Sequence, residues 1–256
     1  MELFVLALSR LVPLLVLISL TLAGSRYVHD LVLKRRPGAA KWAFAAVSFV
    51  GLLAIAPYAW RAVLVVGARW ASQSGRWQLA DLLHTEYDSW NGSRSETILH
   101  QWAYARMGEE DWKGAEEVLA LGDRSPQTLV LTGLCQYYLH DPRAGQTLAS
   151  VGNESGTQLC VRDYLLGRIA QQRGDLGAAF ALYARSARWE PGFFPSTFHG
   201  VRLALVAGRT AQAAAILDEF VKAYPSSAAD PNIRLLRDCI ARKRIPPDEE
   251  FHVVSH

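Results

Sequence analysis

Two long apolar stretches come first in the chain, and a helical alternation of apolar and polar positions follows them. The first stretch covers 3–24, and the second, 42–60, contains no charged residue. A membrane crossing needs roughly 20 apolar residues, so both stretches predict transmembrane helices. Trp42 and Trp60 bracket the second stretch, and aromatic side chains favour the interface between membrane and water.

The segment between the two stretches, 25–41, is basic and predicts the orientation. It carries five Lys or Arg residues against a single Asp. The positive-inside rule places such a loop in the cytoplasm, with both chain ends on the other side. We therefore expect a bacterial inner-membrane protein whose C-terminal domain is periplasmic. A cleaved signal peptide ending near Ala23 is the alternative for the first stretch, and it leaves the domain on the same side.

Beyond residue 60 the helical pattern recurs at intervals close to 34 residues. Gly174 and Gly208 are turn glycines, each with an alanine five positions later and a proline seventeen positions later. Less complete matches begin at Gly75, Glu110 and His140, so the offsets are 35, 30, 34 and 34. Small side chains allow paired helices to approach closely. Mostly small residues stand seven positions before the turns, namely Ala68, Ala103, Gly133, Gly167 and Val201.

This spacing resembles the tetratricopeptide repeat (TPR), a helix–turn–helix unit of 34 residues. The resemblance implies an all-α fold, with two N-terminal transmembrane helices followed by a TPR-like α-solenoid of about five helix pairs. The expected parts are a membrane part at 1–60, a repeat domain at 61–229, and a C-terminal part at 230–256. A generic Ala-rich helical bundle is the alternative to the repeat array.

The sequence also makes specific predictions for the segments at the two ends of the repeat domain. The leading helix of the first repeat, 61–74, is apolar enough either to extend the second span or to lie at the membrane surface. At the other end, 230–243 predicts a capping helix, because a repeat array needs a more polar end. The tail 245–256 has two prolines and three acidic residues, and we expect it to be loose.

Motifs for chemistry are missing from the sequence. It contains no zincin motif, nucleophile elbow, phosphate-binding loop or dinucleotide-binding glycine motif. We therefore predict no enzyme activity, no cofactor and no metal. The net charge of +3 argues against a nucleic-acid partner. Cys135, Cys160 and Cys239 are interpreted as small buried hydrophobes, with a Cys135–Cys160 bridge as the alternative.

The family resemblance also implies where a partner binds, because the leading helices of TPR domains line a concave groove. Tyr and Arg are over-represented among binding hot spots, and Arg can hold a carboxylate through paired hydrogen bonds. An extended peptide or a C-terminal carboxylate suits such a groove. The aromatic residues could fill the core instead, whereas charged residues avoid the core. The implied groove residues are His100, Tyr104, Leu134, Tyr137, Tyr138, Tyr164, Arg168, Gln172, Phe198 and Arg202.

These expectations combine into one functional hypothesis, a membrane-anchored scaffold or assembly factor that holds a partner protein or peptide at the membrane surface. Similar two-span TPR proteins serve in cytochrome c maturation and envelope biogenesis. The short basic loop of this chain departs from the first of these, so only the architecture carries over. The alternative is a structural accessory subunit of a larger membrane complex, because Gly51 and the Ala-rich face of the second stretch permit close helix packing.

Overall fold

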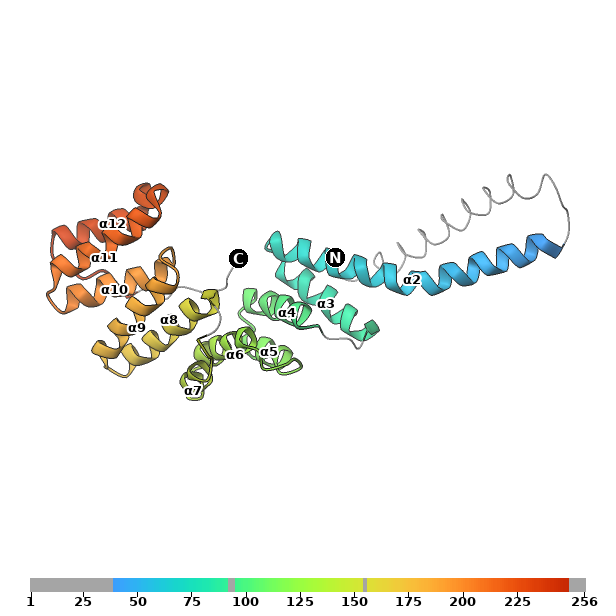
Figure 1. The fold of residues 1–256 in the computed structure, drawn as a ribbon, viewed down its shortest axis with the longest axis horizontal. Helices are drawn as coiled ribbons and strands as arrows, with labels where there is room; N and C mark the ends of the chain where they lie inside the picture. The colour runs from blue at the N-terminus through green and yellow to red at the C-terminus, as the bar shows by residue number, and fades with distance from the viewer. Residues whose placement is uncertain (1–38, 92–94, 154–155, 249–256) are drawn as a thin grey trace. The chain divides into compact units, whose positions relative to one another are not determined.

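The fold is helical throughout the part of the chain that the computed structural model describes, residues 39–91, 95–153 and 156–248 (Figure 1). The chain divides into two compact units, Met1–Ser93 and Arg94–His256. Each unit has its own packing. Among the described residues, no helix has both the length and the hydropathy that a membrane crossing requires. The first predicted span, 3–24, lies outside the described residues.

The first unit contains one helical hairpin, formed by α2 (Ala39–Gln73) and α3 (Trp77–Asn91). Leu64 and Ala68 of α2 are almost wholly buried. Arg61 also donates a hydrogen bond from Nη2 to the carbonyl oxygen of Trp90, at 2.8 Å. The second apolar stretch and the predicted leading helix of the first repeat are thus one continuous helix, with no break at residue 60.

The second unit is a series of helix pairs in which each leading helix also packs on the trailing helix before it. We use "leading" and "trailing" for the first and second helix of a pair. Figure 1 shows the pairs following one another along the chain. They are α4 (Glu96–Gly108) with α5 (Trp112–Leu119), α6 (Pro126–Tyr138) with α7 (Ala144–Ala149), α8 (Gly156–Gln172) with α9 (Leu176–Trp189), and α10 (Phe194–Val206) with α11 (Thr210–Ala223).

All five turns occur at the positions that the repeat spacing predicted. Gly75, Gly174 and Gly208 have φ values of 67°, 79° and 70°, in the left-handed region where glycine carries no steric penalty. Glu110 and His140 occupy the same region with φ values of 60° and 55°. The left-handed residue ends one helix and redirects the chain into the next. The predicted period is therefore confirmed at the level of backbone conformation.

The same hydrogen bond closes each turn, and it occurs once more at the end of the array. In the α8–α9 turn, the amide of Asp175 donates to the carbonyl of Ala170 at 3.0 Å. After α12 (Pro231–Ala241), Lys243 has a φ of 53° and the amide of Arg244 donates to the carbonyl of Cys239 at 2.8 Å. The helix predicted as a cap is therefore built like the leading helix of a sixth pair.

The small residues before the turns lie where the two helices of a pair approach closely. A Cβ atom added at Gly167 would stand 2.6 Å from the Tyr183 ring of α9. A Cβ atom at Gly133 would stand 2.6 Å from the Leu148 side chain of α7. These distances are far below van der Waals contact, so glycine allows the trailing side chain to rest directly on the leading helix.

Three cysteines, all buried and free, fill other parts of the unit, so the alternative of a Cys135–Cys160 bridge does not hold.

Candidate partner-binding site

The residues that follow α12 lie across the leading helices instead of extending away from the domain. We call residues 245–248 the tail segment; it has no helix or strand assigned. The Nε atom of Arg202 in α10 donates to the carbonyl of Pro246 at 3.2 Å, and Arg168 in α8 binds Asp248. The expectation of a loose tail is wrong for these residues, because Asp248 reaches a cluster of cationic and amide donors. Residues 249–256 lie outside the described residues.

Four side chains from α8 and α10 surround the Asp248 carboxylate, and we call them the carboxylate site. Arg168 donates from Nη1 to Oδ1 at 2.9 Å, and Gln171 donates from Nε2 to Oδ2 at 3.1 Å. Arg202 Nη1 lies 3.8 Å from Oδ2, and His199 Nδ1 lies 3.6 Å from Oδ1. Both oxygens of one carboxylate are therefore recognised by groups from two consecutive repeats.

Arg168 is the central group of this site because its position is set by the surrounding protein. Its side chain is only 8% exposed. The Nε atom donates to the Tyr137 hydroxyl at 3.4 Å, and Gln172 donates to the same hydroxyl at 3.2 Å. Burial opposes the charge, but hydrogen bonds to Tyr137 and Asp248 raise the pKa of Arg168 above its ordinary value. The guanidinium is consequently charged and held ready for a carboxylate.

The same surroundings also shift the pKa of Asp248. Burial alone would raise the pKa of this carboxyl. The hydrogen bond from Arg168 and the nearby charges of Arg168 and Arg202 outweigh burial, so the pKa of Asp248 is lowered. The tail segment therefore presents a full negative charge to the site at neutral pH.

Four of the ten predicted groove residues meet at this place. Arg168 and Arg202 bind the tail segment, while Tyr137 and Gln172 adjoin Arg168 through the Tyr137 hydroxyl. Arg168 is an exception to the expectation that charged groups avoid the core. Its side chain is buried, because Tyr137 and Asp248 supply the polar partners that a buried guanidinium requires.

Three other predicted groove residues are part of the core. Leu134, Tyr164 and Phe198 are at most 1% exposed. Tyr164 packs its ring edge-on against Phe193, with the ring centroids 5.6 Å apart. These side chains fill the space between helices, which is the alternative that the sequence left open for the aromatic residues. A partner could touch them only if the pairs came apart.

The remaining three predicted residues belong to α4 and α6, and their contacts connect neighbouring helices. His100 is buried and its Nε2 lies 2.8 Å from Thr128 Oγ1. Burial lowers the pKa of His100, and the charge of Glu96 only partly opposes this. Tyr104 is partly buried and packs against the core, and the Tyr138 ring, also partly buried, stacks on Trp112 with centroids 4.1 Å apart.

Sequence reasoning missed His199, Gln171 and the tail segment. A helix brings residues three apart onto one face. Gln171 stands three residues after Arg168, and His199 three residues before Arg202, so a search around each arginine would have found both. The tail segment left no comparable signal, because a repeat period contains no information about where a later, non-repeating segment lies.

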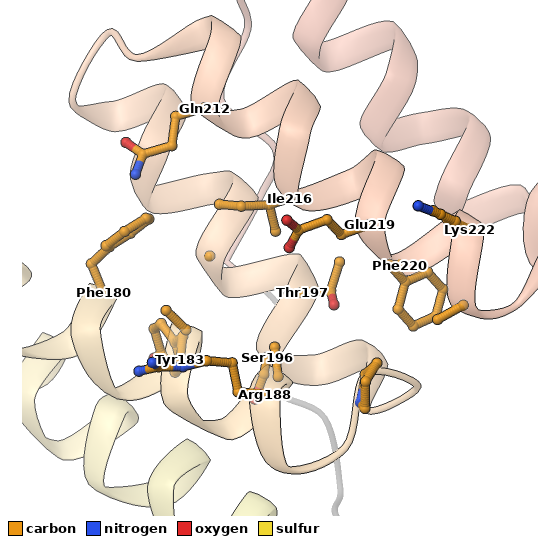
Figure 2. Close-up of a pocket in the computed structure, with 15 residues that line it drawn as sticks. Phe180, Tyr183, Arg188, Ser196, Thr197, Gln212, Ile216, Glu219, Phe220 and Lys222 are labelled. Atoms are coloured by element: carbon orange, nitrogen blue, oxygen red, sulfur yellow. The ribbon is translucent and has the colours of Figure 1, made fainter.

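A separate pocket of about 750 Å³ opens between α9, α10 and α11, as Figure 2 shows. Phe180, Ile216 and Phe220 line it together with the charged residues Arg188 and Glu219. None of the four carboxylate-site residues lines this pocket. This pocket, which we call the trailing-helix pocket after α9 and α11, and the carboxylate site are therefore two different places, and only the carboxylate site holds a segment of chain in the described part of the structure.

Some solved structures are similar to this chain. No protein-family description and no curated protein matches the chain. One similar solved structure is YrrB, a TPR protein with an unusual peptide-binding site. It is 15% identical, with a TM-score of 0.46, over 67% of this chain and 88% of YrrB. The TPR2AB domain of yeast Sti1, solved with pHSP90, is 10% identical with a TM-score of 0.31, over 72% and 97% of the two chains.

The structures that this chain resembles are TPR proteins. The left-handed turns and the stacked hairpins themselves give the second unit a TPR-like fold.

Proposed function

We propose that this chain is a membrane-anchored scaffold whose TPR-like domain holds an extended, acidic segment of a partner protein across α8 and α10. The observation that carries the proposal is the set of contacts around the tail segment. Arg202 binds a backbone carbonyl, and Arg168 binds a carboxylate two residues later. A surface that binds both backbone and side chain of an extended segment has the chemistry needed for a peptide-like ligand.

The geometry favours binding because the Arg168 side chain is already held in place within the folded domain. The Tyr137 hydroxyl accepts a hydrogen bond from Arg168, so little side-chain freedom is lost when a partner carboxylate binds. Hydrogen bonds between a charged donor and a charged acceptor are roughly twice as strong as neutral ones. An acidic residue on the partner would therefore act as the anchor of the interaction.

The membrane part of the proposal rests on the two apolar stretches and on one face of α2. Val63, Val66 and Trp70 are 57%, 68% and 51% exposed, and their spacing places them along one side of the helix. Such a side suits the membrane surface. It would equally suit packing against another subunit, and this observation supports the accessory-subunit alternative.

A phosphatase fused to the C-terminus should be active outside the cytoplasm, and an inactive fusion would contradict the orientation.

The test of the binding function reverses one charge in the site. Arg202→Glu should reduce crosslinking of the partner in native membranes by about tenfold or more, because loss of a charge-assisted contact costs on the order of 2 kcal/mol. Arg234→Glu, at an exposed arginine of α12, is the matched control and should crosslink normally. Circular dichroism should show equal helicity for both variants.

Full capture by the Arg202→Glu chain would mean that the partner binds elsewhere. A partner that remains bound in equal amounts through purification would favour the accessory-subunit alternative instead. These two results are separable, because the first concerns where the partner binds and the second how permanently it is held.

A further inference from the structure

We infer that the tail segment is an internal competitor, which occupies the carboxylate site until a partner segment of the same chemistry displaces it. This inference rests on the proposed function, since it names the kind of ligand that the site accepts and what controls access to it. The ligand would be an extended segment that offers a backbone carbonyl and, two residues later, an aspartate or glutamate carboxylate. Asp248 and the Pro246 carbonyl are the groups that define this description.

The sequence explains why the tail segment is extended at this point. After each of the other turns a trailing helix follows, but after Lys243 the sequence is Arg-Ile-Pro-Pro-Asp. A residue that precedes proline is pushed out of the helical region, and here this applies to both Ile245 and Pro246. No trailing helix begins within the described residues 244–248, and the tail segment passes across α10 and α8 instead.

The two prolines also make this segment easy to hold. Proline has a fixed φ, so an extended segment that contains it loses little conformational freedom when it binds. The short connection to α12 keeps Asp248 close to the site, and tethered groups of this kind reach effective concentrations in the millimolar range. A free ligand with the same contacts must overcome that local concentration, so the tail weakens partner binding without blocking it permanently.

The side chains of Asp248 and Arg168 are exposed to different extents, and the difference favours exchange of the tail segment for a partner segment. The side chain of Asp248 is 41% exposed, whereas that of Arg168 is 8% exposed. The tail can leave from the surface, but its departure takes a carboxylate away from a buried guanidinium. Removing one partner of a buried ion pair is costly unless another takes its place. The site therefore favours release of the tail when another carboxylate replaces it.

The test uses a fluorescent peptide with the sequence of residues 243–256 and full-length chains in detergent. In the Asp248→Asn chain the tail segment binds the carboxylate site more weakly. This chain should therefore bind the peptide at least about tenfold more tightly than the unaltered chain. Asp218→Asn, an exposed aspartate of α11, is the matched control and should behave like the unaltered chain. A peptide with asparagine in place of its aspartate should bind neither chain appreciably.

Equal binding to the unaltered and Asp248→Asn chains, or no binding to either, would overturn the inference. Partner crosslinking distinguishes this failure from a failure of the proposed function. If Arg202→Glu abolishes crosslinking while Asp248→Asn leaves it unchanged, the site binds a partner but the tail does not compete. If Arg202→Glu also leaves crosslinking unchanged, the proposed function itself is wrong.

Discussion

The α8–α9 and α6–α7 pairs share one turn geometry and one close-approach glycine, and they differ in their trailing helices. Trailing helix α9 has 14 residues and is capped by Asp175, which accepts a hydrogen bond from the amide of Ala178. Trailing helix α7 has 6 residues, and Arg143 at its N-cap makes no side-chain cap. His140 nevertheless adopts the left-handed conformation that Gly174 adopts.

The difference teaches that the turn defines the repeat, while the trailing helix can vary. This explains why the sequence match is strong around Gly174 and weak around His140. The comparison of the two pairs also distinguishes two structural roles within the repeat array. The turns and close approaches set the spacing of leading helices, and the side chains on α8 and α10 then determine what those helices bind.

The largest expected effect comes from Asp163, which makes the α8–α9 pair unlike its neighbours. The carboxylate is fully buried and accepts hydrogen bonds from Arg162, Arg185 and Trp189, at 2.9, 2.5 and 3.0 Å for the closest atoms. Asp163→Asn leaves buried charge uncompensated and should lower the free energy of unfolding by about 3–5 kcal/mol, measured by urea denaturation. Asp218→Asn should change it little.

The pH dependence of this contribution follows from the same contacts. Burial raises the pKa of Asp163, but hydrogen bonds from Arg185 and Arg162 outweigh it, so the folded pKa is lowered. The stabilisation is then complete above the unfolded pKa of about 4 and is lost as pH falls through the lower folded value. The Asp163→Asn chain should lack this acid-sensitive component, and an unchanged acid transition would contradict the role given to Asp163.

A middle-sized effect compares a glycine at a close approach between paired helices with a glycine that has open space around it. Gly167→Ala places a methyl group against Tyr183 and should destabilise the chain by about 1–3 kcal/mol. Gly145→Ala in α7 meets its nearest atom only at 3.7 Å and should be neutral or stabilise by up to about 1 kcal/mol. Equal urea midpoints for the two variants would contradict the close approach at Gly167.

The smallest effect concerns the turns themselves. Gly174→Ala puts a side chain into the left-handed region and should cost about 1–2 kcal/mol. His140→Gly relieves the same penalty in the α6–α7 turn and should gain less than about 1 kcal/mol. Thermal unfolding monitored by circular dichroism measures both changes. A gain from Gly174→Ala would show that the turn does not depend on the left-handed conformation.

The repeat spacing predicted the turns because a left-handed turn and a close approach seven positions earlier both favour particular residue types, which can be recognised in the sequence. Even the unfavourable turn residues Glu110 and His140 lay where the period placed them. The length of α7 was not predictable in this way, since it depends on how far the next loop must run before α8 begins.

The site was predictable only in part, because burial and the tail depend on tertiary contacts. Arg168 and Arg202 were recognised from their equivalent positions in two repeats, six residues before each turn. Tyr164 and Phe198 occupy another equivalent position, one helical turn earlier, and that position faces the core. Family geometry alone did not separate these two positions, because residues one helical turn apart lie on the same side of a helix. The pairing of Arg168 with Asp248 joins residues 80 positions apart, which no local pattern reveals.

The central claim is that a partner binds across the leading helices and not in the trailing-helix pocket. The most direct measurement places a photo-crosslinking residue at exposed Gln172, beside the carboxylate site, or at Gln212, which lines the pocket in Figure 2. In native membranes the account predicts partner crosslinks from position 172 and none from position 212. Crosslinks from position 212 with none from position 172 would contradict it.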